Sequence, residues 1–479
     1  MSPHEPRLVR RVKSILASLD NLNEWEVVDF PSPLQSNFDY VYTIDVDAGK
    51  LIITRGESVD GLLQPFPRQI SLSCLDESRG LTMDSLDRAT DEMPDLEQEE
   101  GDAILRDGLG ELDIHPGPPT ALNELQFRIC VDFCFVWKPF IDDQTTWRHP
   151  SMGFNTLAIG ILRIAAWDLE VSADTEIDYP ANGANFPRWK APQTDVFWFH
   201  GYLVVFHRTI STRGSISAAV SKAQSFLNGF RKDSARLIIL SLRHVAFVEL
   251  SSESISCSQV LPLIVNTSAL QCSPGFRLLT YVLSSCCWKP SLAPREQLGA
   301  GLPPEILDMV LRSCSPKDAL ALSQASFIFQ ELYYSTIPQF PDLMLQDSKL
   351  SVTCCGKKAG IRKNLIYCPS CYACKHMGCV GLQSDPPEDP WITCSECKEG
   401  KLCTKLLPGG VNFASRRYPC REYEVLVAGS PKILRLRRSM PTHLRRELWT
   451  PTNVPPRLVD FTIRFNGAFA GVPYGLDDS

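Results

Sequence analysis

The chain has 479 residues, of which 44% are hydrophobic, so it is long enough to bury more than one core, and roughly 100 to 200 residues per domain predict two to four domains. Its formal net charge of −7 argues against a protein that binds nucleic acid or an anionic membrane over its whole surface. The longest apolar runs, residues 129–137 and 157–167, are short and contain Asp132 and Arg163, which predicts no membrane span.

The first 75 residues hold two candidate elements. Apolar residues recur at helical spacing over residues 8–19, and the strand-like runs Tyr40–Asp45 and Leu51–Arg55 flank a turn with Asp47 and Gly49. No apolar stretch of secretory length precedes them, so we expect a cytoplasmic and/or nuclear protein.

An acidic segment follows. Residues 76–113 carry 14 acidic residues against three arginines and few aromatic residues, so ordering them would bury little apolar surface. We interpret this segment as a solvated linker or long loop, with an acidic partner site as the alternative.

Residues 120–290 contain both predicted strands and predicted helices. Phe127–Trp137, Phe197–His207 and Leu237–Leu250 are dense in β-branched and aromatic residues and are predicted strands, whereas Ser217–Phe230 and Phe276–Leu283 are predicted helices. The pattern favours an α+β domain.

No catalytic signature accompanies this domain. The chain lacks a GxSxG elbow, an HExxH helix, a phosphate-binding loop and a GxGxxG turn after a strand, which favours a non-enzymatic protein. His200, His207 and His244 have no carboxylate or cysteine at ligand spacing and are expected to be structural. Through the runs TDVFWFHGYLVVFHR and SARLIILSLRHVAFVEL the region resembles a domain of uncharacterised fungal proteins, a resemblance that brings no known activity. An enzyme without a recognisable motif remains an alternative for this domain.

Residues 301–335 divide into three short predicted helices. Pro303 and Pro304 suit a first helical turn, Ser315 and Pro316 end that helix, and two further helical runs follow. About 35 residues are too few to bury their own apolar face, so this unit needs either a partner surface or the core of the larger domain.

The order of residues in this unit resembles the F-box family. The matches are Leu302, Pro303, Glu305, Ile306, Leu307, Val310, Leu311, Asp318, Leu320, Leu322, Ser323 and Ser326. The resemblance implies docking onto a Skp-type adaptor, which bridges to a cullin, through Leu302, Pro303, Ile306, Leu307 and Leu320. Two positions depart from the family: Cys314 stands where a leucine usually ends the first helix, and Phe329 stands where tryptophan is common.

The cysteines concentrate in the next segment. Nine of the 18 lie between Cys354 and Cys403, and in a reducing compartment such clustering indicates metal binding. Three pairs have the two-residue spacing of a zinc knuckle: Cys368 with Cys371, His376 with Cys379, and Cys394 with Cys397. Cys354 and Cys355 are adjacent, which is an unfavourable spacing for two ligands of one ion.

The ligand order and a tryptophan before the last pair resemble a PHD finger, in which alternate pairs share a zinc ion. The resemblance implies two Zn²⁺ sites, the first with Cys354, Cys355, His376 and Cys379, and the second with Cys368, Cys371, Cys394 and Cys397. A RING finger is disfavoured because Cys379 is not followed by the required knuckle. Cys374 and Lys375 occupy the place of the aromatic cage of methyl-lysine readers, so we expect no methyl-lysine recognition, with binding of a histone or other peptide left open.

Residues 401–450 carry 11 lysines and arginines against three glutamates. This basic segment could contact phosphates, serve as a nuclear localisation signal or touch the acidic segment; without interleaved aromatic residues, a solvated or intramolecular role is favoured and nucleic acid is not an expected partner.

Together these observations predict a multidomain α+β protein with a mixed N-terminal domain, a three-helix F-box and a small zinc-stabilised finger. The expected boundaries are 1–75 as part of the α+β domain, 76–119 as the acidic linker, 120–290 as the α+β domain, 300–340 as the F-box, 350–403 as the finger and 404–479 as a basic C-terminal tail. The expected function is the substrate-recruiting, non-catalytic subunit of a cullin-based ubiquitin ligase, which binds the Skp-type adaptor and an unknown target protein. The alternative is a chromatin-associated protein that binds histone tails through its finger.

Overall fold

The structure is a computed structural model. It describes residues 40–45, 50–59, 62–71, 109–114, 116, 119–137, 141, 152–173, 189–207, 210, 212–251, 254–264, 272–285, 288, 301–335, 343–345, 365–382, 389–400, 411–412, 420–436 and 459–478. The predicted helix at residues 8–19, most of the acidic segment, and Cys354 and Cys355 lie outside these residues.

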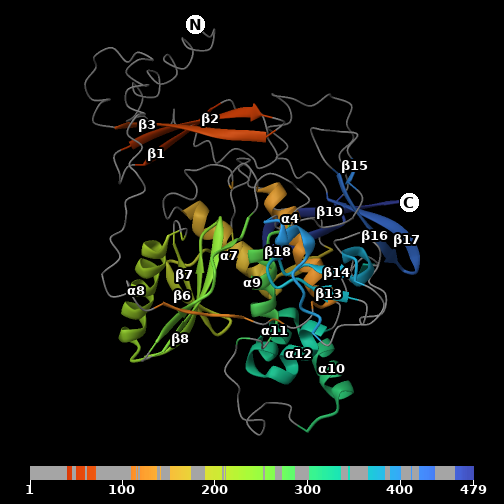
Figure 1. Ribbon diagram of the computed structural model, residues 1–479. Helices are drawn as coiled ribbons and strands as arrows, with labels where there is room; N and C mark the ends of the chain where they lie inside the picture. The colour runs from red at the N-terminus through yellow and green to blue at the C-terminus, as the bar shows by residue number, and fades with distance from the viewer. Residues whose placement is uncertain are drawn as a thin grey trace, which may run out of the picture.

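Three antiparallel strands form a separate sheet near the start of the chain: β1 (Tyr40–Asp45), β2 (Lys50–Val59) and β3 (Leu62–Ser71), in the order β1-β2-β3. Tyr40 pairs with Arg55 and Asp45 with Lys50, which confirms the predicted hairpin. Figure 1 draws this sheet apart from the remaining elements.

A seven-stranded sheet is the centre of the α+β domain. Its strands run in the order β4-β10-β9-β8-β7-β6, with β11 paired to β9. They are β4 (Leu109–Glu111), β6 (Val196–Phe199), β7 (Tyr202–Phe206), β8 (Ala235–Leu240), β9 (His244–Leu250), β10 (Ile255–Cys257) and β11 (Leu261–Pro262). The parallel pairing of β4 with β10 places the end of the predicted acidic linker inside the sheet, which corrects that boundary.

Helices cover both faces of this sheet (Figure 1). Because side chains alternate along a strand, Leu203 and Val205 face α8 (Arg213–Gly229), whereas Val204 and Phe206 face the second layer. That layer contains α4 (Ala121–Val136), α7 (Met152–Ala166) and α9 (Pro274–Ser284). The predicted strands at 197–207 and 237–250 are each a hairpin, and both predicted helices of this region are confirmed.

The predicted strand at Phe127–Trp137 is wrong, because these residues belong to α4. A capping box starts the helix: the Asn123 N–H donates to Thr120 Oγ1 at 3.2 Å, and the Thr120 N–H donates to Asn123 Oδ1 at 2.8 Å. Nearly every described side chain of α4 is buried, including the polar residues Glu124, Arg128 and Asp132, so its described residues form no exposed polar face of the kind that marks a surface helix.

The predicted basic tail contributes to a second seven-stranded sheet, which corrects the last boundary. Its order is β12-β16-β17-β19-β18-β5, with β15 paired to β16. The strands are β5 (Glu170–Ser172), β12 (Leu343–Leu345), β15 (Val411–Asn412), β16 (Cys420–Val427), β17 (Ser430–Leu436), β18 (Phe461–Phe465) and β19 (Ala468–Asp478). This sheet packs against α4, where Trp137 Nε1 donates to the Ala470 carbonyl at 2.9 Å and the Tyr474 hydroxyl donates to Asp132 at 2.8 Å.

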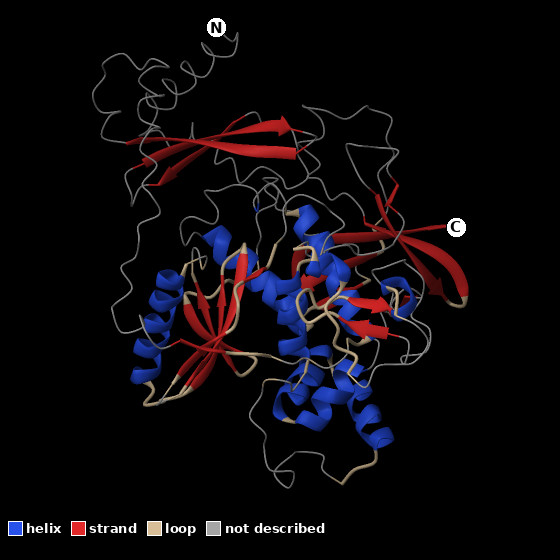
Figure 2. Ribbon diagram, in the orientation of Figure 1, coloured by secondary structure: helices blue, strands red, loops and turns tan. Residues whose placement is uncertain are grey.

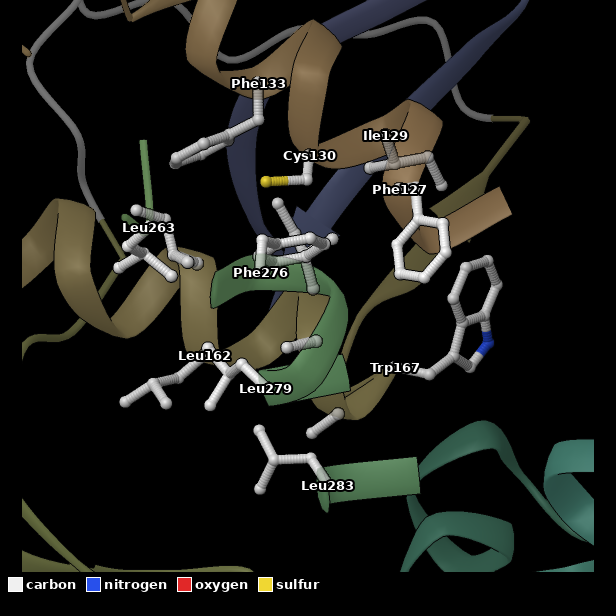
Figure 3. Close-up of a cluster of buried hydrophobic side chains, with 14 of the residues drawn as sticks. Phe127, Ile129, Cys130, Phe133, Leu162, Trp167, Leu263, Phe276, Leu279 and Leu283 are labelled. Atoms are coloured by element: carbon white, nitrogen blue, oxygen red, sulfur yellow. The ribbon is translucent and has the colours of Figure 1, made fainter. Parts of the chain in front are cut away.

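One hydrophobic core joins these layers. Phe127 and Phe133 of α4 lie near Leu162 of α7 and Phe276 and Leu279 of α9, as Figure 3 shows. All five side chains are at most 2% exposed. Among the described helices none is long and apolar enough to cross a membrane.

The three predicted helices of residues 301–335 are present as α10 (Pro304–Ser313), α11 (Pro316–Ala325) and α12 (Phe327–Ser335). Two of them begin with the features expected from the sequence: prolines open α10 and α11, and Ser315 caps α11 by accepting the Asp318 N–H at 3.3 Å. Figure 2 shows the three helices together at one end of the molecule.

Candidate metal centre and apolar helix face

The candidate metal centre is built on a short hairpin, β13 (Leu365–Tyr367) and β14 (Cys374–His376). Cys368 and Cys371 lie in the connection between these strands. A tight turn shapes this connection, because the Tyr372 N–H donates to the Cys368 carbonyl at 2.8 Å.

The second pair of cysteines comes from the start of α13 (Ser395–Lys398). Cys394 is the N-cap residue of this helix and Cys397 lies within it. The segment before the helix runs beside β13, since the Ile392 N–H donates to the Tyr367 carbonyl at 2.9 Å and Trp391 packs on the Tyr367 ring. This pairing brings Cys394 and Cys397 to the first knuckle.

The sulfur atoms of Cys368, Cys371, Cys394 and Cys397 all lie within 4.8 Å of one another, so the four residues could hold a metal ion. A tetrahedral Zn²⁺ with Zn–S bonds of about 2.3 Å needs S–S separations of about 3.8 Å, and the Cys371 and Cys394 sulfurs are 3.9 Å apart. Three of the four thiols are buried and Cys397 is half-buried. The set therefore fits a closed structural site.

Hydrogen bonds prepare one of these thiols to bind a metal as thiolate. The hydrogen bond with Cys371, helped by backbone N–H groups such as that of Cys394 at 3.4 Å, lowers the pKa of Cys368 to about 4 against the opposing effect of burial. Burial raises the pKa of Cys394 to about 12. A bound cation would favour the thiolate form of both, because metal ligands must be deprotonated.

A buried cation lies beside the centre. Lys375 of β14 is 2% exposed and pairs with Glu396, which stands between the two cysteines of the second knuckle. The hydrogen bond from Lys375 lowers the pKa of Glu396 to about 2. The ammonium group also favours the thiolate form of Cys394. Lys375 thus offsets part of the negative charge that four thiolates would gather, a role that sequence reasoning did not assign to it.

The residues of the other predicted zinc site are only partly described. His376 is half-buried at the end of β14, and Cys379 is exposed in the short 3-10 helix η5 (Met377–Val380). Their expected partners Cys354 and Cys355 lie outside the described residues. Cys374, which the sequence left outside both predicted sites, is buried in β14 and does not belong to the group of four.

The second candidate site is an apolar face on α10. Leu302, Ile306, Met309 and Val310 are exposed by 49, 42, 62 and 37%. Ile306, Met309 and Val310 follow helical spacing on one side of α10, and Leu302 lies two residues before the helix begins. Met309 was not among the predicted docking residues, although its helical spacing from Ile306 is visible in the sequence.

The five predicted adaptor-binding residues divide into two groups. Leu302, Pro303 and Ile306 are exposed. Leu307 is buried with Leu311, Ala319 and Phe329 in a small core between the three helices, and Leu320 is buried as well.

This three-helix unit is fixed to the α+β domain through α11 and α12. The Tyr334 hydroxyl donates to the Ala166 carbonyl at 2.6 Å, and Gln330 Nε2 donates to the Ser285 carbonyl at 3.2 Å. Gln324 lies 3.2 Å from a ring nitrogen of His200 at the turn between β6 and β7. The unit therefore has a defined orientation that leaves the outer side of α10 exposed.

Comparisons with known proteins return no relative: no family model, no curated protein and no solved structure matches the chain.

Proposed function

We propose that this chain is the substrate-recruiting F-box subunit of a cullin-based ubiquitin ligase. The observation that carries the proposal is the apolar face of α10, where exposed Ile306, Met309 and Val310 follow helical spacing on a unit fixed to a larger domain, with exposed Leu302 just before the helix. Exposed apolar side chains in such a row are typical of a helix that binds a partner through hydrophobic contact. Leu302, Pro303 and Ile306 are three of the five residues through which the F-box resemblance implies contact with a Skp-type adaptor.

In this proposal the chain performs no chemistry. Its α+β domain, its finger or both hold the target protein, and the rigid attachment of α12 to the α+β domain sets the distance between the target and the ligase. Positioning of this kind raises the rate of a transfer reaction by making the encounter effectively intramolecular.

The four-cysteine centre would hold Zn²⁺ as a structural ion. Tetrahedral Cys₄ sets are a preferred environment for zinc, and the buried thiols leave no coordination position for a substrate. We assign to this ion the ordering of residues 365–400, which contain little apolar core of their own.

The decisive experiment is co-expression of the full chain with a Skp-type adaptor, followed by purification on a tag carried by the chain. We expect the wild-type chain to retain the adaptor and a Leu302→Ala, Ile306→Asp double variant to lose it. Arg312→Ala is the matched control: it removes an exposed side chain of the same helix, which pairs with Asp308 across one helical turn, and should retain the adaptor.

Two outcomes would refute the proposal: a folded wild-type chain that does not bind the adaptor, or a double variant that binds it as well as wild type. A histone-tail titration of the same preparation then tests the alternative. Micromolar peptide binding without adaptor binding would favour the chromatin-associated reader.

A further inference from the structure

The first metal knuckle is packed against the α+β domain. Tyr372, which follows Cys371, is 7% exposed and belongs to the same hydrophobic core as α4, α7 and α9. Its backbone has a φ of 55°, a conformation that non-glycine residues rarely adopt. The aromatic ring is thereby held against the domain, with its centroid 6.4 Å from that of Tyr281.

Two side chains of α9 bind the backbone of this knuckle. Arg277 Nη1 donates to the Cys371 carbonyl at 3.1 Å, and the Tyr281 hydroxyl donates to the Tyr372 carbonyl at 3.1 Å. The two donors are one helical turn apart, so a single face of α9 contacts two successive carbonyl groups.

Both donors are deeply buried. Arg277 is 1% exposed and its guanidinium lies 5.9 Å from the centre of the Phe127 ring, while Tyr281 is 3% exposed. Burial raises the pKa of Tyr281 well above its usual value, which favours the protonated hydroxyl that donates this bond. The loss of either carbonyl partner would remove a hydrogen bond from a buried polar group, which is unfavourable.

The same helix also contacts the three-helix unit. Ser285, directly after the last residue of α9, accepts the hydrogen bond from Gln330 of α12. Tyr334 of α12 lies in the same core cluster as Tyr372. A continuous path of buried contacts therefore runs from Cys371 through α9 to α12.

We propose that Arg277 and Tyr281 are positioning residues that couple metal binding at Cys368, Cys371, Cys394 and Cys397 to the stability of α9 and to the placement of the three-helix unit. The inference rests on the Zn²⁺ occupancy proposed above. It makes the metal a structural element of the whole described assembly of helices rather than of the finger alone. Because coupling between two sites is reciprocal, weakening the contact between α9 and the knuckle must weaken metal binding.

The test compares two conservative variants in the full chain. Tyr281→Phe removes the hydroxyl that binds the knuckle. Tyr202→Phe removes a hydroxyl that is equally buried, donates at the same 3.1 Å distance to a carbonyl of the same helix, Val282, and does not touch the knuckle. Metal affinity is measured by competition for Zn²⁺ with a chromogenic chelator. A Cys371→Ser variant, which lacks one ligand, shows which part of the Zn²⁺ binding belongs to the four-cysteine site.

We expect Tyr281→Phe to weaken Zn²⁺ binding roughly three- to tenfold, the change that corresponds to one lost neutral hydrogen bond, and Tyr202→Phe, which removes a bond to α9 but none to the knuckle, to weaken it less. Hydrogen exchange of the wild-type chain should accelerate in α9 and α12 when the metal is removed. Equal Zn²⁺ affinity of the two variants, or faster exchange confined to residues 365–400, would overturn the coupling. A purified wild-type chain without metal at this site would instead overturn the proposed zinc occupancy, on which the coupling depends.

Discussion

Tyr334 of α12 donates its hydroxyl hydrogen to the carbonyl oxygen of Ala166, the last residue of α7, with 2.6 Å between the two oxygen atoms. Both residues are at most 3% exposed, although 168 positions separate them in the chain. Burial raises the pKa of Tyr334, which keeps the hydroxyl protonated as a donor. This contact joins the three-helix unit to the α+β core.

Removing that hydroxyl should destabilise the protein. Tyr334→Phe leaves the Ala166 carbonyl without this donor in a buried environment, so we expect the free energy of unfolding to fall by about 1 to 3 kcal/mol. Urea denaturation followed by tryptophan fluorescence measures the change. Ser313→Ala, which removes an exposed hydroxyl from α10, should stay within about 0.5 kcal/mol of wild type. Unchanged stability of Tyr334→Phe would mean that the three-helix unit is not held by this bond.

A glycine pair tests the packing of the core. A Cβ atom at Gly160 of α7 would lie 2.9 Å from Cζ of Phe133 and 3.3 Å from Cζ2 of Trp189, whereas a Cβ at Gly229 would meet nothing within 4 Å. Gly160→Ala should therefore lower the melting temperature, with a loss of about 1 to 3 kcal/mol from overpacking. Gly229→Ala, at the end of α8, should be neutral or stabilising by up to about 1 kcal/mol because alanine favours the helix. Similar melting temperatures for the two variants would contradict this packing.

Local signals made much of the fold predictable. The β1–β2 hairpin and the strand content of residues 197–207 and 237–250 follow runs of β-branched and aromatic residues, although the turn that divides each of the two later runs was not predicted. Prolines open α10 and α11, and Ser315 caps α11. The two-residue spacing predicted the pairs Cys368 with Cys371 and Cys394 with Cys397, and the PHD resemblance implied that these pairs share one site. In each case the signal lies within a few residues of the element that it specifies.

Two predictions were wrong. A strand was predicted where α4 lies, and a solvated tail was predicted where β17 lies. The strand interpretation of α4 overlooked the capping pair Thr120 and Asn123 and the four-residue spacing of the buried polar residues Glu124, Arg128 and Asp132. In β17 the basic residues Lys432 and Arg435 concealed the alternation that buries Leu434 and Leu436. The turn at Asn466 and Gly467, with φ values of 50° and 80°, has the positive pair of a type I′ hairpin and was a readable signal for β18 and β19.

Acid should weaken the contact around Asp168. Burial raises the pKa of this carboxyl group, but the hydrogen bond with His200 and the charges of Arg163, His200 and Lys317 outweigh it, so its pKa in the folded protein lies below the usual value. Because the pKa of Asp168 is lower in the folded chain than in the unfolded chain, where it is about 3.9, the ionised carboxylate stabilises the folded state above the unfolded pKa. This stabilisation is lost as the pH falls through the folded pKa. Below about pH 5 the wild-type chain should therefore lose stability more steeply than Asp168→Asn.

Denaturation at several pH values measures this slope. Asp308→Asn is the control, since the Asp308 pair with Arg312 lies on the surface of α10 and should leave the wild-type acid dependence in place. Parallel slopes for wild type and Asp168→Asn would rule out the contribution of Asp168.

The thiols of Cys371 and Cys374, three residues apart, should behave differently. Cys371 belongs to the group of four sulfurs, whereas Cys374 is buried in β14 outside that group. Cys371→Ser should lower the Zn²⁺ content by about one ion per chain, because a four-coordinate structural site requires all its ligands. Cys374→Ala should retain the wild-type content. Elemental analysis of the purified chains decides between them, and a loss of zinc from Cys374→Ala would require a different ligand set.

Adjacent residues of α10 should separate folding from partner binding. Leu307 is 2% exposed in the core between α10, α11 and α12, whereas Ile306 is 42% exposed on the apolar face. Leu307→Ala should cost about 2 to 5 kcal/mol of unfolding free energy through the cavity that it leaves, whereas Ile306→Ala should change stability by less than about 0.5 kcal/mol.

Adaptor binding should be weakened more by Ile306→Ala than by Leu307→Ala. Ile306→Ala removes apolar surface from the face that we assign to the adaptor, so under conditions in which both variants are folded it should bind more weakly than Leu307→Ala. Thermal denaturation and adaptor co-purification of the same two preparations provide the comparison. A folded Leu307→Ala variant that lost the adaptor, together with an Ile306→Ala variant that retained it, would show that the exposed face of α10 is not the docking surface. The apolar residues that contact the partner would then have to become exposed by an opening of the three-helix unit.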